Sequence, residues 1–149
     1  MAKRTIIAVG EGQRREYEAN STVKPGMLIQ VRSDGKCEAH ATADTPNAPR
    51  TVAIENEIFG KPVSRGTSTA GDYAAGDRVL VEACTAGMEV NLIVKGTAAA
   101  ISIGSPITSA GDGTVKVGTV AQAIGYAEEA LDISGQATSY FDHVRVRLA

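Results

Sequence analysis

Several segments of the chain alternate apolar and polar residues with the period of two that is typical of a β-strand with one buried face. The clearest examples are residues 27–32, 78–83, 90–95 and 143–148. The last segment is the most regular, because Val144, Val146 and Leu148 all fall on the same side of the predicted strand. These patterns predict strands rather than helices over much of the sequence.

Shorter apolar runs predict further strands, at residues 5–9, 36–41, 51–55, 100–103, 114–120 and 123–127. Turn-forming pairs separate the predicted strands, among them Asp34-Gly35 and Asp112-Gly113. Glycine accepts a positive φ there, and aspartate bonds its own turn backbone. Only residues 126–132 have helical propensity, and we expect no more than one helical turn from them.

The composition supports the same fold class. Valine and isoleucine together number 25 against 5 leucines, and β-branched side chains pack well on pleated sheets. The 149 residues suit one compact domain, and 16 glycines supply many turns. We therefore predict an all-β, single-domain β-sandwich or β-barrel, a jelly-roll-like arrangement included.

Long polar stretches interrupt the strand pattern. Residues 10–22 contain almost no apolar side chain to bury, so we predict an extended N-terminal arm over residues 1–22 and a β-domain over residues 23–149. Residues 41–50 and 60–77 are rich in small and polar residues, and we expect them to form long polar loops. Loops of this length in a small domain are usually either functional or disordered.

An internal repeat is visible between residues 26–56 and 104–129. Each copy contains a glycine, a strand, an Asp-Gly turn, a second strand, a loop and a third strand. After a short deletion in the second copy, Val52 aligns with Gly125. Two such copies fit the halves of one barrel or sandwich related by a pseudo-twofold axis. Short hairpins with Asp-Gly turns also resemble each other through turn chemistry alone, and that explanation stays open.

Charge and hydropathy limit the partners. The net charge of −2 predicts no general attraction to nucleic acid or to an anionic membrane. No apolar run reaches the roughly 18 to 20 residues that span a bilayer. The apolar run over residues 5–9 is too short for a secretory signal, so we expect synthesis inside the cell.

The residue types needed for catalysis are present without the arrangement that catalysis requires. The Gly10-Glu11-Gly12 segment lacks the third glycine of a dinucleotide-binding turn, and no phosphate-binding loop motif occurs. A nucleophile would have to pair with His40 or His143, and neither Cys37 nor Cys84 lies in a nucleophile-like turn. We predict that the protein is not an enzyme and has no catalytic residues, cofactor or bound metal.

Two clusters of basic residues suggest contacts with a partner. Arg14, Arg15 and Tyr17 combine cations with an aromatic ring, as single-strand binders do, but interleaved glutamates cancel the charge. Arginine and tyrosine are enriched at interface hot spots, so we predict that these three residues contact a protein. The polar side of the last strand forms a second candidate face, for self-association or for the same partner, and consists of His143, Arg145 and Arg147.

Several segments together resemble the small capsid decoration, or cement, proteins of tailed bacteriophages. They are residues 24–31, 33–36, 51–55, 73–79, 87–93 and 123–128. The likeness extends over residues 22–148 in the same order and rests on strand and turn spacing.

The resemblance implies a β-domain that binds the outer surface of an assembled icosahedral head and bridges neighbouring major capsid subunits. It implies a homo-oligomer, with a homotrimer favoured over a homodimer. It also implies synthesis in the host cytoplasm and a location on the outside of the virion. Arg14, Arg15 and Tyr17 are then the expected capsid contacts.

Two other classes of function stay open at this point. A glycan- or host-surface-binding β-domain is the first, although such sites usually need exposed aromatic platforms and the chain has no tryptophan. An enzyme or enzyme-accessory barrel is the second, and the lack of a nucleophile–base pair argues against it.

Overall fold

The chain is nearly all β in a computed structural model that describes residues 5–149. Its strands are β1 (Ile7–Val9), β2 (Gln13–Glu18), β3 (Ile29–Val31), β4 (Cys37–Ala39), β5 (Thr51–Ala53), β6 (Arg78–Ala83), β7 (Glu89–Lys95), β8 (Pro106–Ser109), β9 (Val115–Val117), β10 (Gly125–Ala127) and β11 (Phe141–Leu148). Two single 3₁₀ turns, η1 (Glu57–Phe59) and η2 (Val120–Gln122), complete the regular structure. The predicted all-β, single-domain fold is confirmed. No helix within residues 5–149 is long and apolar enough to cross a membrane.

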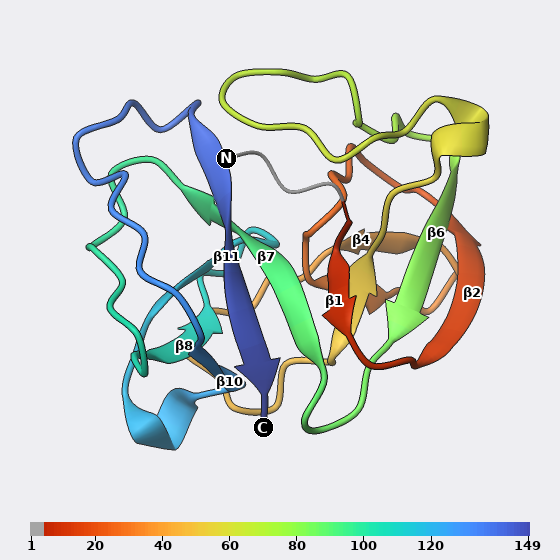
Figure 1. Cartoon of the computed structure of the whole chain (residues 1–149). Helices are drawn as coiled ribbons and strands as arrows, with labels where there is room; N and C mark the ends of the chain where they lie inside the picture. The colour runs from red at the N-terminus through yellow and green to blue at the C-terminus, as the bar shows by residue number, and fades with distance from the viewer. Residues whose placement is uncertain (1–4) are drawn as a thin grey trace.

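The strands close into two small barrels that lie side by side (Figure 1). In the first barrel, β2 pairs with β6 and β6 with β5, while β3 pairs with β4. Two isolated bridges join these sheets into a ring, one between Leu28 and Val52 and one between Ala19 and Cys37. In the second barrel, the strand order is β7-β11-β10-β8-β9, and a parallel pairing of β7 with β9 closes the ring.

Strand β1 links the two barrels. It precedes the first barrel in sequence but pairs antiparallel with β7 of the second. Ile6, just before it, is fully buried, and its backbone N–H donates to Glu55 Oε2 at 3.0 Å. The Asn91 side chain donates to the Thr5 carbonyl at 2.8 Å. These contacts fix β1 between the barrels.

Alternating side chains fill the interior of each barrel, as the sequence pattern predicts. The first barrel encloses Ala19, Val23, Ile29, Cys37, Ala53, Tyr73, Val79 and Val81. The interior side chains of the second barrel pack in one cluster with three outward-facing side chains of the first barrel, those of Leu28, Val52 and Ile54. The two barrels therefore share one apolar contact and form a single domain.

The two barrels also share their strand register. Ile29 pairs with Ala39 in the first hairpin, as Ile107 pairs with Val117 in the second. In the two Asp-Gly turns, Asp34 Oδ1 accepts from the Lys36 N–H at 3.0 Å and Asp112 Oδ1 from the Thr114 N–H at 3.1 Å. The segments 26–56 and 104–129 thus have the same fold.

The equivalence extends to the remaining strands. Leu28 bridges to Val52 as Pro106 pairs with Tyr126, so Val52 corresponds to Tyr126 and not to Gly125. The sequence alignment was therefore wrong by one residue at the third strand. From the same pairings, β6 corresponds to β11 and β2 to β7. The two copies form two separate barrels and not the halves of one.

The expected N-terminal arm differs from the structure. Residues 1–4 lie outside the described residues, but from residue 5 onward the chain belongs to the fold, with β1 on β7 and β2 on β6. The polar composition of residues 10–22 was misleading, because the side chains of residues 13–16 are exposed while the backbone of β2 pairs with β6.

Two smaller expectations concern residues 126–132 and residues 100–103. Residues 126–132 contain the end of β10 and no helical turn, because the Ala127 N–H donates to the Ser105 carbonyl in a strand pairing. Residues 100–103 do not form a strand, and only Ile101 makes an isolated bridge, to Leu131.

Candidate interaction surfaces

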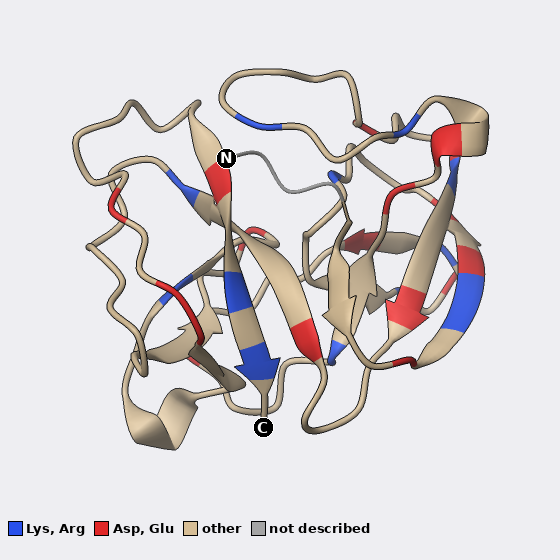
Figure 2. Cartoon of the chain, in the orientation of Figure 1, with Lys and Arg blue, Asp and Glu red and all other residues tan. Residues whose placement is uncertain are grey.

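Strand β2 presents its basic residues at the outer side of the first barrel (Figure 2). Arg14 is two-thirds exposed, yet its Nε lies 3.1 Å from Oε1 of Glu82, a carboxylate that is 1% exposed. The other Glu82 oxygen accepts from the Gly12 N–H at 3.0 Å. A buried, bonded carboxylate therefore fixes the Arg14 guanidinium at the surface, which lowers the entropy lost when a partner binds it.

The other two predicted contact residues on β2 differ in exposure. Arg15 is exposed and donates to the Gln13 side chain at 3.3 Å. Tyr17 is half-buried, because its ring packs against the interior of the first barrel. Arg14 and Arg15 are thus available to a partner, while Tyr17 also has a structural role.

A groove of about 510 Å³ adjoins β2. It is lined by Glu16, Asn56, Phe59, Lys61, Tyr73, Gly76, Asp77 and Arg78. Lys61 Nζ lies 3.3 Å from Asp77 Oδ2, and the hydrogen bond from the Ala74 N–H, followed by the contact with Lys61, lowers the pKa of Asp77. This wall of the groove is therefore an ion pair at neutral pH.

Tyr73 forms the floor of the groove. Its hydroxyl donates to the Ile54 carbonyl at 2.8 Å, and the side chain is 1% exposed. Burial raises the pKa of Tyr73 to about 12, so the phenol stays neutral. The floor offers an apolar ring and no titrating group.

The η1 turn, near the start of the β5–β6 connection, exposes two adjacent large apolar side chains. Ile58 is 90% exposed and Phe59 is 73% exposed, both in η1. The turn is closed by Gly60, whose φ of +69° is left-handed. Phe59 also lines the groove, so η1 and β2 border the same hollow. Exposed apolar pairs of this kind are typical of contact sites.

The predicted polar face of β11 is only partly a surface. His143 is 2% exposed, and its Nε2 lies 3.2 Å from the Pro25 carbonyl oxygen of the first barrel. Arg145 is half-buried, and its backbone N–H donates to Glu129 at 2.9 Å. Arg147 is exposed and pairs with Glu128 at 2.9 Å. The first barrel covers β11 at His143, so that residue is not available to an external partner.

No group of three or more His, Cys, Asp or Glu side chains in the described part of the chain is placed to hold a metal ion. Both cysteines are free thiols. Burial raises the pKa of Cys37, and it raises the pKa of Cys84 to about 12. A thiolate is the reactive form of cysteine, so the raised pKa values disfavour the reactive form of both side chains at neutral pH.

The fold matches that of a known phage protein. A solved structure described as head fiber gp8.5 N base in bacteriophage phi29 superimposes with a TM-score of 0.56 at 17% identity, over 92% of this chain and 93% of that chain. The chain therefore has the fold of that head-fibre base along nearly its whole length. No protein-family model matches the sequence. No curated protein sequence matches it either.

The sequence did not indicate several residues of these surfaces. Glu82 follows the strand alternation as a residue of the outer face, and only its hydrogen bonds show that it orients Arg14. The groove combines residues from β2, η1 and the start of β6. The Ile58-Phe59 pair was a usable signal, because it is an isolated apolar pair among polar residues.

Proposed function

We propose that this protein is a structural component of a tailed-phage virion that binds the outer surface of the assembled head. The observation that carries the proposal is the fold shared with the phi29 head-fibre base across both chains. The resemblance of the strand and turn segments to capsid decoration proteins supports the same role independently of that structure. The proposed role is mechanical and not catalytic.

In this role the protein bridges neighbouring major capsid subunits. A protein that binds only the assembled lattice stabilises that lattice by mass action. Several head-binding surfaces held in one oligomer raise the avidity by roughly 10² to 10⁴ over a single contact. A homotrimer remains the favoured assembly.

The proposed capsid-binding surface lies on the first barrel and combines the exposed Arg14 and Arg15 of β2 with Ile58 of η1. Arg14 is held in place by Glu82, and Ile58 offers an apolar anchor that is 90% exposed. A buried apolar anchor with a surrounding rim of charge is the usual anatomy of a protein interface.

Co-sedimentation with purified, expanded heads that lack their decoration protein tests the proposal. We expect saturable binding at a fixed copy number per head and a higher melting temperature of the decorated heads. The double variant Arg15→Glu/Ile58→Asp is expected to bind at least tenfold more weakly. The matched control is Val120→Asp, at an apolar residue of the second barrel that is 71% exposed.

Absence of binding by the wild-type protein contradicts the proposed function, and a glycan array then tests the alternative of a glycan- or host-surface-binding domain. Binding that the Val120→Asp change weakens as much as the double variant contradicts the assigned surface. Binding should also weaken as salt rises, because exposed charges are screened within about 8 Å at physiological ionic strength.

A further inference from the structure

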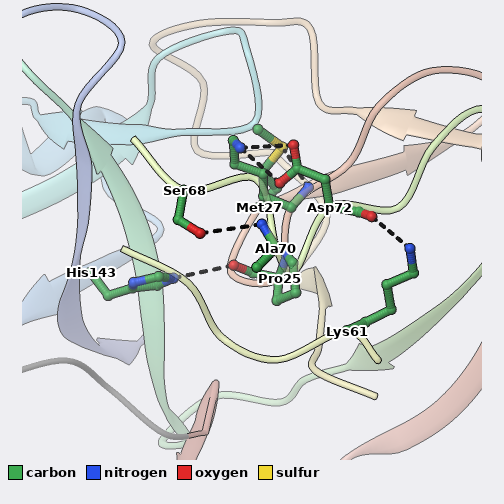
Figure 3. Close-up of polar contacts among 8 residues, drawn as sticks. Pro25, Met27, Lys61, Ser68, Ala70, Asp72 and His143 are labelled. Carbon is green, nitrogen blue, oxygen red and sulfur yellow. Dashed lines mark hydrogen bonds and ion pairs between the residues drawn. The ribbon is translucent and has the colours of Figure 1, made fainter. Parts of the chain in front are cut away.

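The contact between the two barrels includes a short segment of the first barrel, Lys24–Gly26, that docks on the second. The Gly26 carbonyl accepts from the Ile93 N–H at 3.1 Å. The Pro25 carbonyl lies 3.2 Å from His143 Nε2, and Figure 3 shows the imidazole ring directed at it. Lys24 Nζ lies 4.7 Å from the centre of the Phe141 ring. Pro25 and Gly26 are buried by this contact.

The second barrel has an equivalent segment, residues 102–104, in the same conformation. Gly26 and Gly104 both have a positive φ, +98° and +84°. Their N–H groups make equivalent 2.7 Å hydrogen bonds, to the Ala53 and Ala127 carbonyls. The surroundings differ, because residues 102–104 are exposed, with Ile103 at 73% exposure. The second barrel therefore displays a docking segment that the rest of the described chain does not cover.

The first barrel has the corresponding receiving face. By the shared register, Ile93 corresponds to Glu18, His143 to Arg78 and Phe141 to Gly76. Arg78 and Gly76 line the groove beside β2, and both are exposed. The Ala19 N–H donates to the carbonyl oxygen of Asp77, the residue just before β6, at 2.8 Å. Antiparallel bonding alternates along a strand, so the Glu18 N–H points away from β6, as the Ile93 N–H points away from β11.

Residues 102–104 do not occupy the groove of their own chain in the way that residues 24–26 occupy the second barrel. A twofold axis between the barrels would make their contact reciprocal. Residues 24–26 of the first barrel would dock on the second barrel, and residues 102–104 of the second barrel would fill the groove of the first. Instead, Ile103 and Arg78 are both exposed. The two barrels are therefore not related by a twofold axis. Applying the same rotation and translation to the second barrel places the next barrel outside this chain, in another molecule.

We propose that the groove beside β2 binds residues 102–104 of a second copy of this chain. Ile103 of that copy enters the groove, beside the exposed Phe59 and above the Tyr73 floor. Its Ile103 carbonyl accepts from the Arg78 guanidinium, and its Gly104 carbonyl accepts from the Glu18 N–H. The contact between barrels within a chain is thus repeated between chains. The inference is independent of capsid binding.

This contact is head-to-tail, because one copy contributes its second barrel and the other its first. Head-to-tail contacts close into rings of three or more copies when the rotation permits, and they do not produce a twofold dimer. The residues around the segment on the second barrel, Pro106 and Tyr126, are half-buried, whereas their equivalents Leu28 and Val52 are fully buried.

Light scattering coupled to size-exclusion chromatography tests the proposal with two variants and a control. Ile103→Asp removes the docking side chain, and Arg78→Glu removes the donor of the groove. Each variant alone is expected to be monomeric, while Val120→Asp, a change at another exposed apolar residue of the second barrel (71% exposed), keeps the wild-type assembly. Circular dichroism checks that all three variants are folded.

Mixing the two monomeric variants is the decisive step. The Ile103→Asp chain keeps an intact groove, and the Arg78→Glu chain keeps an intact segment, so an equimolar mixture is expected to form a 1:1 heterodimer and nothing larger. A wild-type protein that is a monomer or a twofold dimer at several hundred micromolar overturns the proposal. A mixture that stays monomeric while each variant is folded also overturns it.

Discussion

The two barrels have nearly the same interior and different exteriors. Equivalent interior positions carry Ile29 and Ile107, Val79 and Val144, and Val81 and Val146. Equivalent exterior positions carry Leu28 and Pro106, Val52 and Tyr126, Ile54 and Glu128, and Leu80 and Arg145. Closing a small ring of strands requires the same interior volume in both barrels. The exteriors differ because the first barrel packs against the second, while the corresponding face of the second does not pack against the first.

The connections between the last two strands of each barrel differ as well. The β5–β6 connection of the first barrel, residues 54–77, is longer than the β10–β11 connection, residues 128–140. The extra length carries η1, with its exposed Ile58 and Phe59, and supplies much of the groove. The shared fold thus acts as the support, and the longer loop gives the first barrel its interaction surface.

Truncating one equivalent interior residue in each barrel gives the largest expected effect. Ile29→Ala and Ile107→Ala each remove a fully buried side chain, which costs about 2–5 kcal/mol in the free energy of unfolding. Urea denaturation measures the loss. Because the barrels share an apolar contact, each variant should unfold in a single transition. Two separated transitions contradict a single cooperative domain, and Val120→Ala, at an exposed site, is the control.

The next largest effect comes from two ion pairs, one in each barrel, whose members Glu82 of β6 and Arg147 of β11 occupy equivalent positions. Glu82 is buried and bonds both Arg14 and Gly12, so Glu82→Gln should cost about 1–3 kcal/mol in the free energy of unfolding. Its counterpart Arg147 makes an exposed pair with Glu128, and Arg147→Gln should cost less than about 1 kcal/mol. Equal losses in urea denaturation contradict the difference in burial.

Acidification also distinguishes the two barrels, because the first barrel has a histidine, His40, at a position where the second barrel has none. Burial lowers the pKa of His40, and the corresponding residue of the second barrel is Gly118. The unfolded chain then binds the proton more readily, so stability falls as pH drops below about 6.5. The maximum loss is about 2 kcal/mol between pH 6.5 and 5, from a slope of about 1.4 kcal/mol per pH unit.

Urea denaturation across that pH range measures the slope, and His40→Gln is the control. The variant should lose less stability than the wild type as the pH falls from 6.5 to 5. Parallel pH profiles for the two proteins contradict a role for His40.

Exchanging an interior residue between the barrels gives the smallest effect. Cys37 corresponds to Val115, and Cys37→Val gives the first barrel the side chain of the second. A similar-sized apolar replacement should change the free energy of unfolding by less than about 1.5 kcal/mol in either direction. A larger loss indicates that the two interiors are shaped differently despite their common register.

The sequence predicts the barrel strands wherever one face is buried. Residues 78–83, 90–95 and 143–148 alternate clearly and form β6, β7 and β11. Strand β2 was missed because residues 13–16 are exposed on both faces, so no alternation marks it. Strand β8 was missed because it is short and begins at Pro106. Alternation detects burial of one face, and it does not detect backbone pairing in an exposed strand.

The interaction surfaces were less predictable than the fold. The exposed arginines of β2 were identified by residue type, but His143 was placed on the same kind of surface and is buried. Its burial depends on residues 24–26 of the other barrel, more than a hundred residues earlier in the chain. A contact between two barrels leaves no local pattern, and the groove depends on the same kind of distant packing.

Strand β1 also makes the strand pairing that is most distant along the described chain. The strands of each barrel follow one another along the chain, so each ring forms from its own continuous segment. Strand β1 pairs with β7, about eighty residues later, and must wait until that strand is in place. Its amide protons should therefore be the last to gain protection during refolding.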